Sequence, residues 1–223
     1  MYFVVLSYPR TGSTVIQRLI NTDKSSICVG EKPMTINHLY DFYASIESSK
    51  FDIPNLFPEI DLSDDRNPLF NANAVDMPLL LNAIKGMYEQ FVLCPRDFTN
   101  IGWKENFISS YADGKLADEQ IHFIRSMFPG VKFVLNVRNP EKCAESMIWK
   151  IRDGAIDEIE HRMNWMTDGF NSGLFGYDAI LMNHDEWSQD GSVAVKELVN
   201  FGFNIDIAES ENVLNEHLNH LKN

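Results

Sequence analysis

The protein has 223 residues, 44% of them apolar, so the chain is long enough to bury a substantial core. Acidic residues outnumber basic ones by 32 to 19, which gives a net charge of −13. This charge excludes a general nucleic-acid-binding protein, which needs a basic face, and disfavours docking on an anionic membrane. The same charge repels strongly acidic macromolecular acceptors. Any anion-binding site must therefore depend on the groups gathered at that site, and not on the charge of the whole protein.

The cysteines and the apolar runs predict a cytoplasmic protein. Cys28, Cys94 and Cys143 lie far apart and form no CxxC pair. Reduced thiols in a reducing compartment are therefore the simplest interpretation. No stretch reaches the roughly 18 apolar residues of a transmembrane helix. The apolar start of the chain, MYFVVL, is too short to be a signal peptide.

The first 31 residues predict a strand, a loop, a helix and a second strand. Residues 2–7 (YFVVLS) and 27–31 (ICVGE) are short apolar runs, typical of strands buried in a parallel sheet. Between them, the apolar residues of segment 15–20 repeat at i, i+1, i+4 and i+5, which places them on one helix face. The three elements form a βαβ unit with a right-handed crossover.

The rest of the chain predicts further alternation of strands and helices. Helices are expected over residues 34–46, 77–92, 116–129, 140–154, 155–170 and 192–203. Strands are expected over residues 100–107, 131–139 and 177–187, the last running into a loop. Residues 51–75, rich in proline, aspartate and asparagine, are expected to form a loop or lid. The pattern predicts an α/β protein with a central parallel sheet flanked by helices.

The segment YPRTGST, residues 8–14, has the composition of an anion-binding loop. A strand that turns into a helix through glycine and hydroxyl residues directs backbone N–H groups at an anion. Arg10 adds a guanidinium group, and Ser13 and Thr14 add hydroxyl donors. The Walker A pattern fails, because no lysine precedes Ser13 and no glycine stands five residues before Gly12. A tight turn with a capping hydroxyl remains the alternative.

A second group of polar residues follows the strongest predicted strand. That strand ends in Asn136, Val137 and Arg138, where a nucleotide triphosphatase places an aspartate for Mg²⁺. Ligands of open α/β sheets bind at such carboxyl ends. Ser146 and Lys150 lie four residues apart on the predicted helix, and hence on one face. Arg138, Ser146 and Lys150 could hold a second phosphate, the alternative being a solvated helix face.

Together, YPRTGST and VRNPEKCAES resemble the two phosphate-binding segments of the PAPS-dependent sulfotransferases (PAPS is 3′-phosphoadenosine 5′-phosphosulfate). The first is similar to the 5′-phosphosulfate loop in its arginine form, as in tyrosylprotein and carbohydrate sulfotransferases. The second is similar to the 3′-phosphate segment, in which a serine follows an arginine by eight residues, as Ser146 follows Arg138. The resemblance covers roughly residues 2–31, 101–106 and 132–150.

The resemblance implies a P-loop NTPase-like sulfotransferase fold in a single domain over residues 1–223. Residues 32–100 would be a helical and loop insertion on the acceptor side. The implied reaction is the in-line transfer of a sulfuryl group from PAPS to a hydroxyl acceptor, with no metal. A carbohydrate or another small molecule is the expected acceptor. The oligomeric state is not predicted.

The resemblance also assigns roles to individual residues. The PAPS-binding residues would be Arg10, Thr11, Gly12, Ser13, Thr14, Arg138, Ser146 and Lys150. Arg10 would also be catalytic, together with Glu31 as the base and Lys104 of GWKEN as the contact to the sulfuryl group. A loop salt bridge is the alternative for Glu31, and an ordinary exposed lysine is the alternative for Lys104. His184 replaces the tyrosine that the family often has at this position and that would contact adenine.

Two other functions stay open from the sequence. One is a P-loop nucleoside or nucleotide kinase with a degenerate phosphate loop, against which the missing lysine and the missing strand-end aspartate count. The other is a non-catalytic protein of the same fold that binds adenosine bisphosphate.

Overall fold

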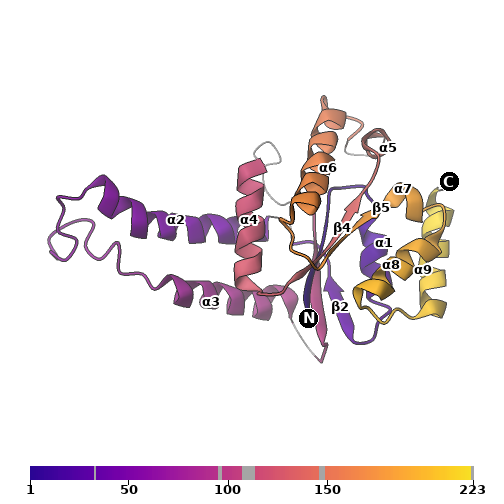
Figure 1. The fold of residues 1–223 in the computed structure, drawn as a ribbon, viewed down its shortest axis with the longest axis horizontal. Helices are drawn as coiled ribbons and strands as arrows, with labels where there is room; N and C mark the ends of the chain where they lie inside the picture. The colour runs from indigo at the N-terminus through magenta and orange to yellow at the C-terminus, as the bar shows by residue number, and fades with distance from the viewer. Residues whose placement is uncertain (33, 95–96, 107–113, 146–148, 222–223) are drawn as a thin grey trace.

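A parallel sheet forms the centre of the protein in the computed structural model, which describes residues 1–32, 34–94, 97–106, 114–145 and 149–221. In these residues the sheet has five strands in the order β2-β3-β1-β4-β5 (Figure 1). The strands are β1 (Tyr2–Ser7), β2 (Ser26–Val29), β3 (Asn100–Glu105), β4 (Lys132–Val137) and β5 (Ala179–Asn183). The predicted parallel sheet is therefore confirmed.

The strand register brings the carboxyl ends of the central strands together. Leu6 of β1 lies opposite Glu105 of β3 and Leu135 of β4, and Ser7 lies opposite Asn136. Since all pairings are parallel, the residues that follow these strands emerge at one edge of the sheet.

Helices cover both faces of the sheet. The helices are α1 (Ser13–Ile20), α2 (Thr35–Leu56), α3 (Met77–Tyr88), α4 (Gly114–Met127), α5 (Pro140–Ala144), α6 (Ala155–Ser172), α7 (His184–Trp187), α8 (Gly191–Phe201) and α9 (Ile207–Leu221), with a π-helical turn, η1 (Glu89–Leu93), after α3. Val4 and Leu6 of β1 pack with α2, α3, α4 and α6, whereas Phe3 and Val5 pack with α1, α8 and α9. Alternate residues of β1 thus contribute to two apolar layers, one on each face of the sheet.

The predicted helix over residues 34–46 and the predicted loop over residues 51–75 both differ from the structure. Helix α2 continues to Leu56, so the prediction of a loop over residues 51–75 is wrong for residues 51–56. Pro54 lies in the last turn of α2, where the missing N–H costs one hydrogen bond and ends the helix soon afterwards. In Figure 1, α2 and α3 project away from the sheet and are joined at their far end by residues 57–76.

The predicted helix over residues 140–154 is also wrong in its second half. Helix α5 ends at Ala144, and residues 149–154 form turns. Trp149 is almost fully buried, and its indole N–H donates to the carbonyl of Pro9 at 3.3 Å. This long-range contact holds Trp149 beside the loop after β1.

Two elements near the C-terminus were not predicted. The chain after β5 forms the short helix α7 instead of a loop, because the Asn183 side chain caps it by accepting from the Asp185 N–H at 3.0 Å. Helix α9 was not predicted either. Among the described residues, no helix has both the length and the apolar character needed to cross a membrane.

Candidate active site

The loop between β1 and α1 lies at the carboxyl end of the central strand. Gly12, at φ 83°, directly precedes α1, and Arg10 has a φ of 77°, which is uncommon for a residue other than glycine. The side chains of Thr11 and Ser13 are buried, whereas Arg10 and Thr14 are exposed. Backbone N–H groups at the start of α1 and two exposed polar side chains therefore meet here, as an anion site requires.

The neighbouring strand and α7 hold this loop in place. The Asn136 amide donates to the Thr11 carbonyl at 2.8 Å and accepts from the Trp187 indole N–H at 3.0 Å. His184 is almost fully buried against Trp187, with the two ring centroids 4.5 Å apart. A Cβ atom at Gly12 would lie 2.4 Å from the His184 ring. His184 therefore packs under the loop.

We expect Gly12→Ala to lower the free energy of unfolding by about 3 kcal/mol, because it combines backbone strain with a clash against His184. Gly173→Ala is the matched control, since Gly173 has a similar φ of 80° but no heavy atom near its added Cβ. That control isolates the backbone cost of about 1 kcal/mol. Denaturant unfolding measures both values, and equal losses would contradict the packing of His184 against the loop.

Glu31, Lys104 and Thr14 come together beside the loop. The Lys104 ammonium lies 2.5 Å from Glu31 Oε1 and donates to Thr14 Oγ1 at 3.0 Å. Lys104 is only 7% exposed, so the alternative of an ordinary exposed lysine is wrong. The ion pair fits both interpretations of Glu31, because a catalytic base and a structural carboxylate would each pair with a cation here.

Asn106 joins the same cluster and was missed by the sequence analysis. Its amide N–H donates to Glu31 Oε1 at 2.6 Å, and its amide oxygen accepts from the hydroxyl groups of Ser7 and Ser13. Ser7 and Asn136 were missed as well. The available signal was a polar residue at the end of an otherwise apolar strand, a position at which ligands of α/β sheets bind.

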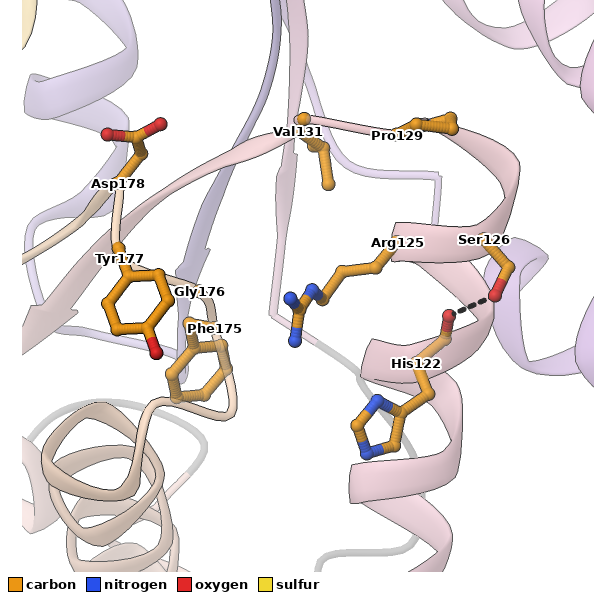
Figure 2. Close-up of a pocket in the computed structure, with 10 residues that line it drawn as sticks. His122, Arg125, Ser126, Pro129, Val131, Phe175, Gly176, Tyr177 and Asp178 are labelled. Carbon is orange, nitrogen blue, oxygen red and sulfur yellow. Dashed lines mark hydrogen bonds between the residues drawn. The ribbon is translucent and has the colours of Figure 1, made fainter.

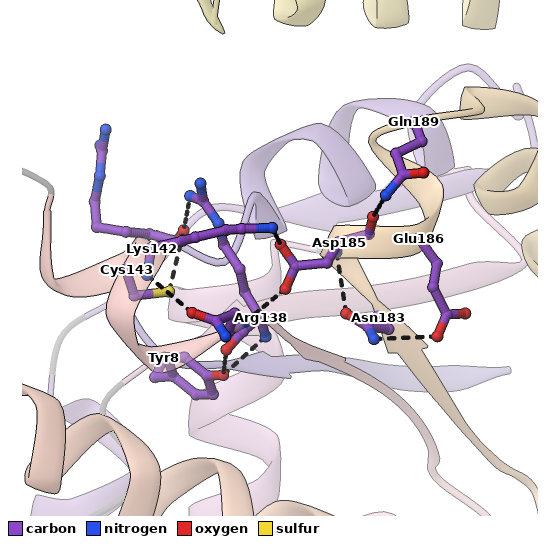
Figure 3. A network of polar contacts seen from close by, with 10 residues as sticks. Tyr8, Arg138, Lys142, Cys143, Asn183, Asp185, Glu186 and Gln189 are labelled. Carbon is purple, nitrogen blue, oxygen red and sulfur yellow. Dashed lines mark hydrogen bonds and ion pairs between the residues drawn. The ribbon is translucent and has the colours of Figure 1, made fainter.

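Arg138 lies at the end of β4, where the sequence placed it, and contacts the loop directly (Figure 3). Its guanidinium Nη1 donates to the Arg10 carbonyl at 2.9 Å. Its backbone N–H donates to the Tyr8 hydroxyl at 2.8 Å, and that hydroxyl donates to the Arg138 carbonyl at 2.5 Å. The thiol of Cys143 also donates to the Arg10 carbonyl, at 3.6 Å. Arg138 and Tyr8 thus tie the loop to β4.

Tyr8→Phe should lower the free energy of unfolding by about 2 kcal/mol, because it leaves a partly buried N–H and a partly buried carbonyl of Arg138 without the Tyr8 hydroxyl as their partner. Burial raises the pKa of the Tyr8 phenol above its ordinary value of 10.0, so this stabilisation is present below pH 10 and falls at higher pH. Tyr43→Phe is the control, since the Tyr43 hydroxyl is exposed and makes one long bond, of 3.4 Å, to Glu47. Chemical denaturation at pH 7 and pH 11 measures both effects. Equal losses in the two variants would contradict the role of Tyr8.

Helices α5 and α7 are joined by a charged network next to Arg138 (Figure 3). Asp185 accepts from the Lys142 ammonium at 2.8 Å and from the Asn139 backbone N–H at 2.7 Å. Burial alone would raise the pKa of Asp185, but the hydrogen bonds from Lys142 and Asn139 outweigh it and lower the pKa below the usual range. The carboxylate thus stays charged and keeps α5 next to α7.

Lys150 and Ser146 are the remaining predicted phosphate residues. Lys150 is exposed and lies in the turns after α5 rather than on the predicted helix. Ser146 itself lies outside the described residues. Arg138 is therefore the described member of this group that lies beside the loop.

A hollow of about 540 Å³ opens at the opposite end of the strands (Figure 2). Val131 and Asp178, which line it, directly precede β4 and β5, so it lies at the amino ends. Arg125 extends into the hollow, and its Nη1 donates to the Leu174 carbonyl at 2.9 Å. This hollow is separate from the cluster around Glu31. In the part of the chain that the structure describes, no group of three or more His, Cys, Asp or Glu side chains could hold a metal ion.

Comparison with known proteins places these features in context. Residues 3–172 match the model of the sulfotransferase family. The sulfotransferase domain of the Synechococcus PCC 7002 olefin synthase superposes with a TM-score of 0.56 at 15% identity, over 94% of this chain and 75% of that domain. Sulfotransferase STF9 from Mycobacterium avium gives 0.52 at 15% identity, over 98% and 67%. The predicted P-loop NTPase-like sulfotransferase fold is thereby confirmed. A search of curated proteins gives no significant match.

Proposed function

Because the chain belongs to the sulfotransferase family, we propose that it transfers a sulfuryl group from PAPS to the hydroxyl group of a carbohydrate or another small molecule. The observation that carries this proposal is the cluster beside the anion loop. There a cation (Lys104) lies within hydrogen-bond distance of both a carboxylate (Glu31) and a helix-terminal hydroxyl (Thr14). These are the groups needed to bind an anionic donor and to take a proton from an acceptor.

The residues present suit a donor with two phosphate groups. Arg10 and Lys104 flank the start of α1, and Arg138 contacts the loop from β4. Thr11 in the same loop is fully buried, and its hydroxyl has no hydrogen-bond partner among the described residues. Charge-assisted hydrogen bonds from arginine to phosphate are the strong ones. This set of hydrogen-bond donors therefore favours an anionic ligand such as PAPS.

When bound, PAPS would supply the sulfuryl group and a phosphate leaving group. Arg10 and the N–H groups of Gly12 to Thr14 would hold the 5′-phosphosulfate, and Arg10 would stabilise charge on the leaving oxygen. Lys104 would turn from Glu31 to the sulfuryl oxygens, leaving Glu31 to accept the proton of the acceptor hydroxyl. The protein would thus act by positioning and by charge stabilisation, as in phosphoryl transfer.

The 3′-phosphate would distinguish PAPS from ATP. Arg138 would bind it with a guanidinium group already positioned by the Arg10 carbonyl. Ser146 and Lys150 are proposed to complete this subsite from the segment after α5. Cations would thereby replace the magnesium ion on which a kinase depends.

We propose that residues 32–100 form the acceptor side of a single domain over residues 1–223. The segment starts directly after Glu31, and α2 begins four residues beyond that carboxylate. An acceptor held against this segment would therefore present its hydroxyl group near Glu31. The net charge of −13 favours a neutral acceptor over an acidic one.

The test is a transfer assay with labelled PAPS against panels of sugars, phenols and lipids, in the presence of EDTA. We expect label on at least one hydroxyl compound. A thermal-shift measurement should show a larger stabilisation by adenosine 3′,5′-bisphosphate than by ADP. A larger shift with ADP, together with ATP turnover that depends on Mg²⁺, would instead support a kinase. Tight binding of the bisphosphate with no transfer would support a non-catalytic binding protein.

A further inference from the structure

Asn106 occupies a central place among the groups at the carboxyl edge of the sheet. It directly follows β3, is 5% exposed, and lies beside Ser7 because Leu6 and Glu105 are paired one position earlier. Its side chain contacts Glu31 after β2, Ser7 at the end of β1 and Ser13 at the start of α1. One amide thus connects the candidate base with the strand and the helix that carry the donor loop.

The orientation of this amide follows from the chemistry of its partners. A carboxylate only accepts hydrogen bonds, so the NH₂ end of Asn106 must face Glu31. The amide oxygen then faces the hydroxyl groups of Ser7 and Ser13, which both donate to it, the second over a longer 3.5 Å. With donor and acceptor ends both engaged and the side chain buried, Asn106 has little freedom to move.

We propose that Asn106 is a positioning residue, which fixes the carboxylate of Glu31 relative to the donor loop. The carboxylate is thereby held where it can accept the proton of an acceptor hydroxyl that attacks the sulfuryl group in line. This inference rests on the proposed function. It adds a residue to the site whose role is to act through Glu31.

The two groups that hold Glu31 are not equivalent. Lys104 and Asn106 both donate to the same oxygen, at 2.5 and 2.6 Å. Lys104 also donates to Thr14, has a long flexible side chain, and would turn towards the sulfuryl oxygens during transfer. Asn106 has a short side chain anchored at its other end by Ser7. When Lys104 turns away, Asn106 is the described contact that keeps Glu31 in place.

The kinetic test compares Asn106→Ala with Asn100→Ala. Asn100 is the matched control because it lies at the other end of β3 and donates to Ser26 of β2 at 2.9 Å. With the best acceptor from the panels, Asn106→Ala should lower kcat by ~10- to 100-fold, the effect of a misplaced catalytic group. The Kd of adenosine 3′,5′-bisphosphate should stay within about twofold, since the only lost contact to a residue of the donor loop is the long 3.5 Å bond from Ser13. Asn100→Ala should leave both values unchanged.

Two further variants separate positioning from a packing role. Asn106→Asp keeps the shape but replaces the donor facing Glu31 with an acceptor, so it should lower kcat at least as much as Asn106→Ala. Ser7→Ala removes the anchor of the amide oxygen, and its loss of kcat should not add to that of Asn106→Ala in a double-mutant cycle. Full additivity, or a normal kcat in Asn106→Asp, would overturn the proposal.

Crystal structures in a Lys104→Ala background test the inference without any acceptor, because Lys104 also holds Glu31 in the resting site. In the double variant Lys104→Ala/Asn106→Ala the Glu31 carboxylate should move by about 1 Å or more, or occupy several rotamers, whereas in Lys104→Ala alone, where Asn106 still donates to it, it should stay in place. If Glu31 keeps its position in the double variant, the inference is wrong even if the wild type transfers sulfate. If the wild type transfers no sulfate to any compound but Glu31 moves in the double variant, the proposed function fails and the positioning contact stands.

Discussion

Arg10→Ala is expected to abolish sulfuryl transfer, with a fall in kcat of at least roughly 1,000-fold, the upper end for removing one group that stabilises transition-state charge. Arg10 is exposed on the loop between β1 and α1, and its positive φ is held by contacts of its carbonyl with Arg138 and Cys143. Those contacts involve the backbone, so the alanine variant keeps them. The loss should therefore lie in charge stabilisation rather than in folding.

The matched control is Arg18→Ala. Arg18 lies on α1, directly after the same loop, and its guanidinium pairs with Glu216 at 2.5 Å on the surface. An exposed ion pair of this kind contributes little to stability. Initial rates with labelled PAPS should be normal in Arg18→Ala and undetectable in Arg10→Ala. Near-normal turnover by the Arg10 variant would rule out the proposed chemistry.

Arg138→Ala is expected to weaken the binding of adenosine 3′,5′-bisphosphate by about 100-fold, which corresponds to the loss of ~3 kcal/mol in hydrogen bonds to a charged group. ADP lacks the 3′-phosphate, so its Kd should change by less than about threefold. The variant should thus lose its discrimination between the two nucleotides. Isothermal titration calorimetry with each ligand measures both constants.

Arg125→Ala controls for the structural part of this change. The Arg125 guanidinium donates to a backbone carbonyl, that of Leu174, at the same 2.9 Å that separates Arg138 from the Arg10 carbonyl. It lies at the amino end of the strands, beside the separate hollow. Arg125→Ala should leave both nucleotide affinities unchanged. Equal weakening of ADP and the bisphosphate in Arg138→Ala would show that Arg138 acts only by holding the loop.

Helices and strands were predictable from the sequence where the pattern of apolar residues lies within one short segment. The apolar run Tyr2–Ser7 and the helix face over residues 15–20 are visible in short windows, and the structure has β1 and α1 there. The second half of the predicted helix over residues 140–154 failed for a different reason. Trp149 is drawn to the Pro9 carbonyl, more than a hundred residues earlier in the chain, and no periodicity in the segment signals that contact.

The candidate site was likewise predictable only in part, where a short segment of sequence carried the signal. The loop residues from Arg10 to Thr14 were predicted as site residues because glycine, hydroxyl groups and a guanidinium at a strand-to-helix turn are typical of an anion-binding loop. The family resemblance then pointed to Glu31 and Lys104 individually. Their pairing and the part played by Asn106 were not predictable, because an asparagine after a strand has many uses and only its neighbours decide among them.

The sequence by itself determined the alternation of strands and helices and the turn of glycine and hydroxyl residues after β1, because these depend on residue types within short segments. The tertiary structure decided which strand ends meet. The order β2-β3-β1-β4 places Glu31, Asn106, Ser7 and Arg138 along one edge, although they come from four separate parts of the chain. Parallel register fixes that edge, and only the order of the strands determines which polar side chains share it.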